Sequence, residues 1–246
     1  MKKISPIYLQ NKGAMNKSLT SLYISKLDLL KKNLKDILAD ELEAIKPANP
    51  LLISINDEQA YSSADIRVMI FGQETNLWCS EVDNFQIEEI QNAYKSWFYD
   101  GHARSYGGFY RGLFRFNELL KQKFPTKNIE IIWNNLSKIG RLQGRGPQSE
   151  KIQNYENNYF NVIEEEIKIL KPNLNLFLTG PDRDYLINQR LNAYSFKPVK
   201  NYNIRKLAKI EDLLNIPSFR TYHTQYLGFS KKTDEYFNAI IDELSF

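Results

Sequence analysis

Cysteine and histidine are scarce in this sequence, and long apolar runs are absent. One cysteine, Cys79, and two histidines occur among 246 residues. A single cysteine excludes an internal disulfide, and it cannot supply a cysteine-rich zinc site or a cysteine-ligated iron–sulphur cluster. No stretch approaches the roughly 18 apolar residues of a membrane span, and Ser5 and Pro6 interrupt the amino-terminal segment too early for a signal peptide. We therefore expect a soluble, cytoplasmic protein with no membrane partner.

Charge of one sign is not in large excess either. Lysine and arginine number 33 against 29 aspartate and glutamate, which gives a formal charge of +4. This balance is compatible with a polyanionic partner but is far from that of a polybasic tail. The sequence has no repeats, low-complexity tracts or obvious linkers, and 42% of its residues are hydrophobic. We expect one domain over residues 1–246, in which residues 1–50 form a mainly helical extension.

The spacing of apolar residues predicts alternating helices and strands. Residues 18–46 carry apolar side chains at three- and four-residue spacing, which predicts a long helix. Residues 51–55 are a short strand candidate, and IRVMIF at 66–71 is the first buried strand. Further strands are expected at 129–135, 173–180, 207–212 and 218–223, and further helices at 85–99, 108–123, 156–170, 182–191 and 233–244, the last with Thr233 as its cap. This order predicts an α/β fold, a three-layer α/β/α sandwich with a mainly parallel central sheet.

Polar residues follow several of these strands. GQETN (72–76) follows the first buried strand, where we expect a turn, WNN (133–135) closes the second and TGPDRD (179–184) follows the third. A fourth segment, TYHTQYL (221–227), carries His223. The carboxyl ends of parallel strands point the same way, so Gln73, Glu74, Asn134 and His223 are expected to converge. A carboxylate, an imidazole and amides in one cleft can position water, stabilise a leaving anion and recognise a planar ligand.

Three of these segments resemble motifs of the uracil-DNA glycosylase superfamily. GQETN is similar to the family's GQDPY, IIWN to its LLLN, and HTQYL to its HPSPL, and the three occur in the same order. The resemblance implies that Glu74 takes the place of the catalytic aspartate, which orients the attacking water. It implies that His223 donates a hydrogen bond to the departing base, and that Asn134 recognises the base edge. No metal or organic cofactor is implied.

The resemblance also implies contacts with substrate and DNA. Gln73 matches a backbone-anchoring position of the first motif, and Leu227 matches the leucine that enters the duplex in place of the flipped nucleotide. The aromatic platform for the base is open among Trp78, Phe85 and Phe109. The remaining expected substrate contacts are Gly72 and Asn76. The remaining expected DNA contacts are Arg141, Arg145, Gln225 and Tyr226.

Departures from the motifs leave the substrate open. Thr75 and Asn76 stand where the family has a proline and the tyrosine that excludes a 5-methyl group, so a damaged base other than uracil is an alternative. Ordinary roles also stay open. Glu74 can cap a neighbouring turn, His223 can be a hydrogen-bonded histidine at the edge of the core, and Asn135 can replace Asn134 if the alignment shifts by one.

The sequence therefore predicts a hydrolase that cleaves the N-glycosidic bond of uracil or a related damaged base in single- or double-stranded DNA, acting as a monomer. The alternative is a catalytically inactive module of the same fold that binds nucleic acid or another protein, because fold does not guarantee function.

Overall fold

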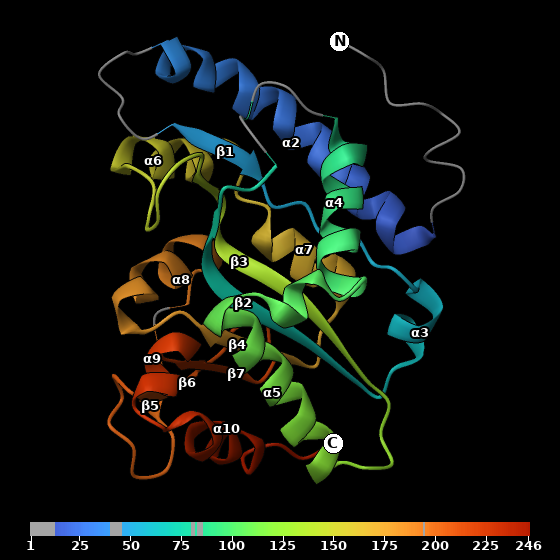
Figure 1. Ribbon diagram of the computed structural model, residues 1–246, viewed down its shortest axis with the longest axis vertical. Coiled ribbons are helices and arrows are strands. Elements are labelled where there is room, and N and C mark those ends of the chain that lie inside the picture. The colour runs from blue at the N-terminus through green and yellow to red at the C-terminus, as the bar shows by residue number, and fades with distance from the viewer. Residues whose placement is uncertain (1–12, 40–45, 80–81, 83–85, 194) are drawn as a thin grey trace. The chain divides into compact units, whose positions relative to one another are not determined.

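The computed structural model describes residues 13–39, 46–79, 82, 86–193 and 195–246 (Figure 1). The chain divides into two compact units, each assembled from three segments. The first unit comprises residues 1–58, 74–97 and 135–170, and the second comprises 59–73, 98–134 and 171–246. No helix within the described residues is long and apolar enough to cross a bilayer.

Seven strands form one sheet in the order β1-β3-β2-β4-β7-β6-β5. The strands are β1 (Pro47–Pro50), β2 (Ile66–Asn76), β3 (Ile129–Arg141), β4 (Leu174–Leu178), β5 (Phe196–Pro198), β6 (Leu207–Ile210) and β7 (Ser218–Thr221). β4 pairs in parallel with β2 and with β7. The β1–β3, β6–β7 and β5–β6 pairs are antiparallel. Helices flank this sheet, which confirms the expected α/β sandwich.

The helices are α2 (Ala14–Ala39), α3 (Glu58–Ser63), α4 (Ile87–Tyr99), α5 (Gly107–Lys123), α6 (Glu150–Tyr159), α7 (Ile163–Leu170), α8 (Asp184–Leu191), α9 (Thr224–Phe229) and α10 (Thr233–Ile241). Short 3₁₀ turns cover His102–Ser105 and Pro181–Arg183. In the first unit α2 packs on α6 and α7. In the second unit α5 packs on α9 and α10, in green and red in Figure 1.

The first unit buries a charged cluster in its core. Lys138 Nζ lies 2.8 Å from Glu166 Oε1, and both side chains are fully buried. Tyr23 donates its hydroxyl to the same Glu166 oxygen at 2.6 Å, and Glu156 accepts the backbone N–H of Lys138. Burial lowers the pKa of Lys138 against the opposing effect of Glu166. Burial, reinforced by Glu166, raises the pKa of Tyr23. The cluster joins α2, β3, α6 and α7.

Several expected elements differ from those observed. Residues 51–55 are not a strand, although their apolar side chains are buried. Leu51 N–H donates to the Lys138 carbonyl of β3, but side chains of neighbouring helices satisfy the groups that follow. Ile53 N–H donates to Tyr23 Oη, and the Ile53 carbonyl accepts from Gln91. The nearest strand is β1, so the expected helical extension over residues 1–50 ends in a strand.

Three other boundaries are corrected. β2 continues through GQETN to Asn76, so this segment is strand and not a turn. The helix expected at 156–170 is two helices, α6 and α7, separated by residues 160–162, where Phe160 is buried and stacks on Tyr23. Thr233 is the first residue of α10 and not its cap, which is Lys232.

Candidate active site

In the second unit, parallel pairing sets β2, β4 and β7 in register. Phe71 of β2 pairs with Phe177 of β4, which pairs with Arg220 of β7. Two residues further along each strand come Gln73, Thr179 and Tyr222, and His223 follows directly. The rings of Phe71 and Phe177 stack at 4.4 Å beneath this edge. The amide of Gln73, which lies within β2, is therefore level with a hydroxyl, a phenol and an imidazole that follow the carboxyl ends of β4 and β7.

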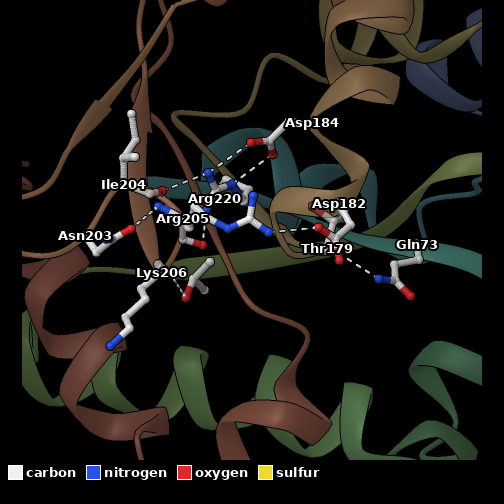
Figure 2. Close-up of polar contacts among 10 residues, drawn as sticks. Gln73, Thr179, Asp182, Asp184, Asn203, Ile204, Arg205, Lys206 and Arg220 are labelled. Carbon is white, nitrogen blue, oxygen red and sulfur yellow. Dashed lines mark hydrogen bonds and ion pairs between the residues drawn. The ribbon is translucent and has the colours of Figure 1, made fainter.

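Gln73 is fixed by a hydrogen bond across the two strands. Its Nε2 donates to the Thr179 carbonyl at 2.7 Å (Figure 2). With the amide nitrogen engaged, Oε1, which accepts no hydrogen bond from the part of the chain that the structure describes, is the acceptor that this half-buried side chain can offer to a ligand. The Thr179 hydroxyl is buried and has no hydrogen-bond partner among the described residues. An unpaired buried hydroxyl is costly, so this strand end has unused hydrogen-bonding capacity.

Gly180 connects the ends of β4 and β7 beside Tyr222. Gly180 has a φ of 76°, which favours glycine, and its N–H donates to the Thr221 carbonyl at 2.9 Å. A Cβ atom at position 180 would lie 3.7 Å from the Tyr222 ring. Tyr222 in turn packs against Tyr226, with ring centroids 4.5 Å apart.

His223 is held in one tautomer. It is the N-cap residue of α9, and its Nδ1 accepts the backbone N–H of Gln225 at 3.2 Å. Burial lowers the pKa of His223 below its usual value of 6.5. At neutral pH the ring is therefore uncharged, and because Nδ1 is an acceptor the proton resides on Nε2. His223 can donate one hydrogen bond to a ligand through Nε2.

Phe109 stacks on His223, with centroids 6.0 Å apart and an interplanar angle of 26°. Close packing of α9 on α5 sets this contact. Thr224 donates its hydroxyl to the Gly108 carbonyl at 2.7 Å, and a methyl group added at Gly112 would overlap the Thr224 side chain. Because Gly108 and Gly112 are four residues apart, they lie on one face of α5 and allow α9 to approach.

Buried Arg220 supports the same strand end from β7 (Figure 2). Its Nε and Nη2 bind the two carboxylate oxygens of Asp184 at 2.9 and 3.0 Å. Nη1 and Nη2 also donate to the carbonyls of Arg205 and Ile204. Arg205 forms a second, exposed pair with Asp182. Burial raises the pKa of Asp184, although Arg220 opposes this rise. The network fixes the start of α8 and the 204–205 segment against β7.

The other expected site residues are distributed between the two units. Gly72 is buried on β2 beside Gln73. Glu74 is half-buried and belongs, with exposed Asn76 and nearly buried Trp78, to the first unit. Phe85 lies outside the described residues. Gln225 and Tyr226 are exposed on α9 in the second unit, and their contact with DNA stays a prediction.

Arg141 and Arg145, which we expect to contact DNA, differ in their own contacts. Arg141 donates from Nε to the Pro147 carbonyl at 2.7 Å and is half-buried. Arg145 is exposed. Both belong to the first unit, where Arg145 is the freer of the two to meet a phosphate.

Two expected contacts do not match the burial of their residues. Leu227 is fully buried in α9, so the expectation that it enters a duplex is wrong for this structure; the exposed large side chains of α9 are Tyr226 and Phe229. Asn134 is also fully buried, and its Nδ2 lies 3.5 Å from Met69 Sδ. Asn135 is nearly as buried and lies in the first unit. The contact of either amide with a base stays a prediction.

Comparison with models of known protein families finds no match to this sequence. Comparison with curated proteins likewise finds no matching relative. Within the described ranges, no three His, Cys, Asp or Glu side chains are grouped so that they could hold a metal ion.

Sequence reasoning did not identify several residues that shape this site. They are the buried Thr179 hydroxyl, Tyr222 beside Gly180, and the hydrogen bond from Thr224 to the Gly108 carbonyl. All three depend on contacts between segments that are far apart in the sequence. The sequence did contain a signal for the close packing of α9 on α5. Gly108 and Gly112 are four residues apart on a predicted helix, and two small residues at this spacing let another helix approach closely. No local signal marks Arg220 as buried.

Proposed function

We propose that this protein is a DNA glycosylase-like hydrolase that removes uracil or a related damaged base from DNA. The observation that carries the proposal is the state of His223, an uncharged imidazole whose free nitrogen is a donor. A neutral donor suits an oxygen that becomes anionic as a base departs, because it supplies a hydrogen bond without a competing full charge in the ground state. The ordered resemblance of GQETN, IIWN and HTQYL to the glycosylase motifs supports the same reaction.

In the proposed reaction, water adds to C1′ of the deoxyribose as the bond to the base nitrogen breaks. The base leaves with the bonding electrons, and the proton lost by water is passed to solvent or to the base. Glu74 follows Gln73 on β2 and supplies the carboxylate that orients the water and stabilises positive charge on the sugar, as in other glycoside cleavages. His223 Nε2–H stabilises the negative charge on the departing base.

The second unit offers contacts for the base itself. Gln73 is fixed by Thr179, so its Oε1 is a pre-oriented acceptor for an N–H of a base edge. Phe109 backs the His223 ring, which limits the imidazole to a small range of orientations. Preorganised donors and acceptors of this kind contribute more in a transition state than mobile ones, because they do not reorganise during the reaction. A flipped base is the ligand that this combination suits.

Binding without cleavage is the second candidate function. It is favoured by the burial of Leu227 and Asn134. With both side chains buried, the proposed reaction would need another residue to enter the duplex and another amide to recognise the base. In this case the exposed Tyr226 and Phe229 rings of α9 would contact bases by stacking. A cytoplasmic location and action as a monomer are part of the proposal for either function.

A strand-cleavage assay tests the proposal. Labelled single- and double-stranded DNA with one uracil is incubated with the protein and then with alkali, which cuts at abasic sites. Cleavage by the unaltered protein that is lost in Glu74→Gln supports the hydrolase. Tight binding of the same DNA, with no abasic site formed from uracil or from a panel of damaged bases, supports the binding module instead.

A further inference from the structure

A pocket lies in the second unit beside the α5–α9 contact, and Gly108, Thr224 and Gln225 belong to its lining. Its volume is about 480 Å³, within the range of small-molecule sites. It is formed by α5, α9 and the start of α10. The residues that line it and enter the argument are Arg111, Arg115, Thr233, Asp234 and Phe229.

The two arginines of the pocket differ in how their charge is used. Arg115 binds both carboxylate oxygens of Asp234, at 2.9 and 2.7 Å, and also contacts Glu118. Among the lining residues the charges of Arg115 and Asp234 therefore offset each other, while Glu118 is not part of the lining. Arg115 holds the pKa of Asp234 below its usual value. Arg111 has no ion-pair or hydrogen-bond partner among the described residues. The pocket thus presents one uncompensated guanidinium.

The surroundings of Arg111 favour an anion. Thr233 lines the pocket and is the first residue of α10, a nine-residue helix whose amino-terminal end carries partial positive charge. The two carboxylates of its first turn, Asp234 and Glu235, are paired with Arg115 and Lys232. A guanidinium presents parallel N–H donors that match the oxygens of a phosphate. A phosphate group at Arg111 and Thr233 would be held by the positive charge of the guanidinium and by its directional hydrogen bonds.

The pocket is also lined by an exposed aromatic ring. Phe229 is 80% exposed, the largest fraction among the exposed large hydrophobic side chains of the described residues. An exposed phenylalanine beside a cationic pocket provides a face on which a planar ring can stack. The volume exceeds what a phosphate ion alone requires, which leaves room for a ring attached to it.

We propose that this pocket binds a small phosphate monoester that carries a planar ring, such as a nucleoside monophosphate. Arg111 and Thr233 hold the phosphate, and Phe229 stacks on the ring. Arg115 and Asp234 form a neutral wall that fixes the start of α10 against α5. The site does not depend on the reaction proposed for His223, so the two proposals fail or succeed separately.

The test is calorimetric titration of the full chain at low ionic strength with three probes: inorganic phosphate, a nucleoside 5′-monophosphate and the corresponding nucleoside. The monophosphate should bind at least about tenfold more tightly than either part, because both contacts are made at once. Arg111→Gln should weaken binding of the monophosphate by about tenfold or more. The matched control is Lys121→Gln, which removes one exposed positive charge from the same helix outside the pocket and should leave binding unchanged.

Phe229→Ala tests the contact with the ring separately from the contact with the phosphate. It should reduce the affinity for the monophosphate to that for inorganic phosphate, and it should leave phosphate binding intact. Equal affinity of Arg111→Gln and the unaltered protein, or no binding of the monophosphate, would overturn the proposal. Binding of single-stranded DNA that depends on Arg111, without binding of the monophosphate, would also overturn it and would assign the pocket to a nucleic-acid backbone.

Discussion

The imidazole of His223 lies against the ring of Phe109 while its Nδ1 accepts the N–H of Gln225, so stacking and hydrogen bonding fix the same side chain. Each contact comes from a different helix, α5 or α9. The donor nitrogen of His223 is therefore oriented by the packing of two helices, and changes in that packing should be visible at the histidine.

The protonation of His223 can be measured directly. Burial lowers its pKa, so we expect its Hε1 resonance to titrate with a midpoint below 6.5. The unfolded chain then binds the proton more tightly than the folded chain. The free energy of unfolding is therefore highest above pH 6.5, and it falls as the pH drops from 6.5 to the lower pKa of His223 in the folded chain. The chain has two histidines, so one His102→Gln sample assigns the signals. A midpoint at or above 6.5 would contradict the neutral donor.

The contact between Gly112 and Thr224 predicts the effect of one added methyl group. Gly112→Ala should destabilise the protein by about 1 to 3 kcal/mol, because the methyl overlaps Thr224 and forces α9 away from α5. The NMR resonances of His223 should also shift in Gly112→Ala. Urea unfolding and NMR spectra measure the two effects.

Gly228→Ala is the matched control for this prediction. Gly228 lies in α9, and a Cβ atom added there meets nothing within 4 Å. This variant should be as stable as the unaltered protein or slightly more stable, since alanine favours a helix. Equal stability of the two alanine variants would show that α9 does not pack as described.

The buried Lys138–Glu166 pair should be sensitive to loss of one partner. Glu166→Gln leaves the ammonium buried without its counter-charge, which costs about 3 to 5 kcal/mol for such pairs. Glu164→Gln, two residues earlier on α7, removes a carboxylate that pairs at the surface with Lys168 and should have little effect. Denaturant unfolding compares them. If Lys138→Met and Glu166→Gln are combined, the loss should be smaller than the sum of the single losses, and strict additivity would argue against a coupled pair.

Arg220 and Arg205 offer a comparison of a buried and an exposed arginine in one network (Figure 2). Arg220→Lys should cost roughly 1 to 3 kcal/mol, because lysine cannot bind both Asp184 oxygens and the two backbone carbonyls at once. Arg205→Lys should change little, because its pair with Asp182 is exposed. Thermal unfolding of both variants is the measurement, and a larger loss in Arg205→Lys would reverse the assigned roles.

The spacing of apolar residues predicted those helices and strands whose pattern lies entirely within their own segment of the sequence. The strands β2, β4, β6 and β7 and the helices α5 and α10 were expected close to their observed positions, because each combines an apolar stripe with flanking polar or turn residues. The start of α2 could not be predicted. Glu58 accepts the N–H groups of Met15 and Asn16 at 2.9 Å, so a carboxylate more than forty positions away caps that helix.

The failures share a physical cause. LLISI is apolar and buried, as a strand would be, but after Leu51 the hydroxyl of Tyr23 and the amides of Gln91 and Asn16 take the place of a neighbouring strand. Leu227 matches a motif position, yet it packs into the core while Tyr226 is exposed. A motif indicates which residue types are present, and tertiary packing decides which of them face a ligand.

The most direct test of the account is a single-turnover comparison of His223→Gln with His102→Gln on uracil-containing DNA. His102 is exposed and serves as the matched control. Loss of the donor to a departing base should slow cleavage by about 10²- to 10³-fold in His223→Gln, with binding of the DNA largely retained, whereas His102→Gln should cleave at the unaltered rate. Equal rates in the two variants, or no cleavage of uracil or any other damaged base by the unaltered protein, would contradict the proposed role of His223.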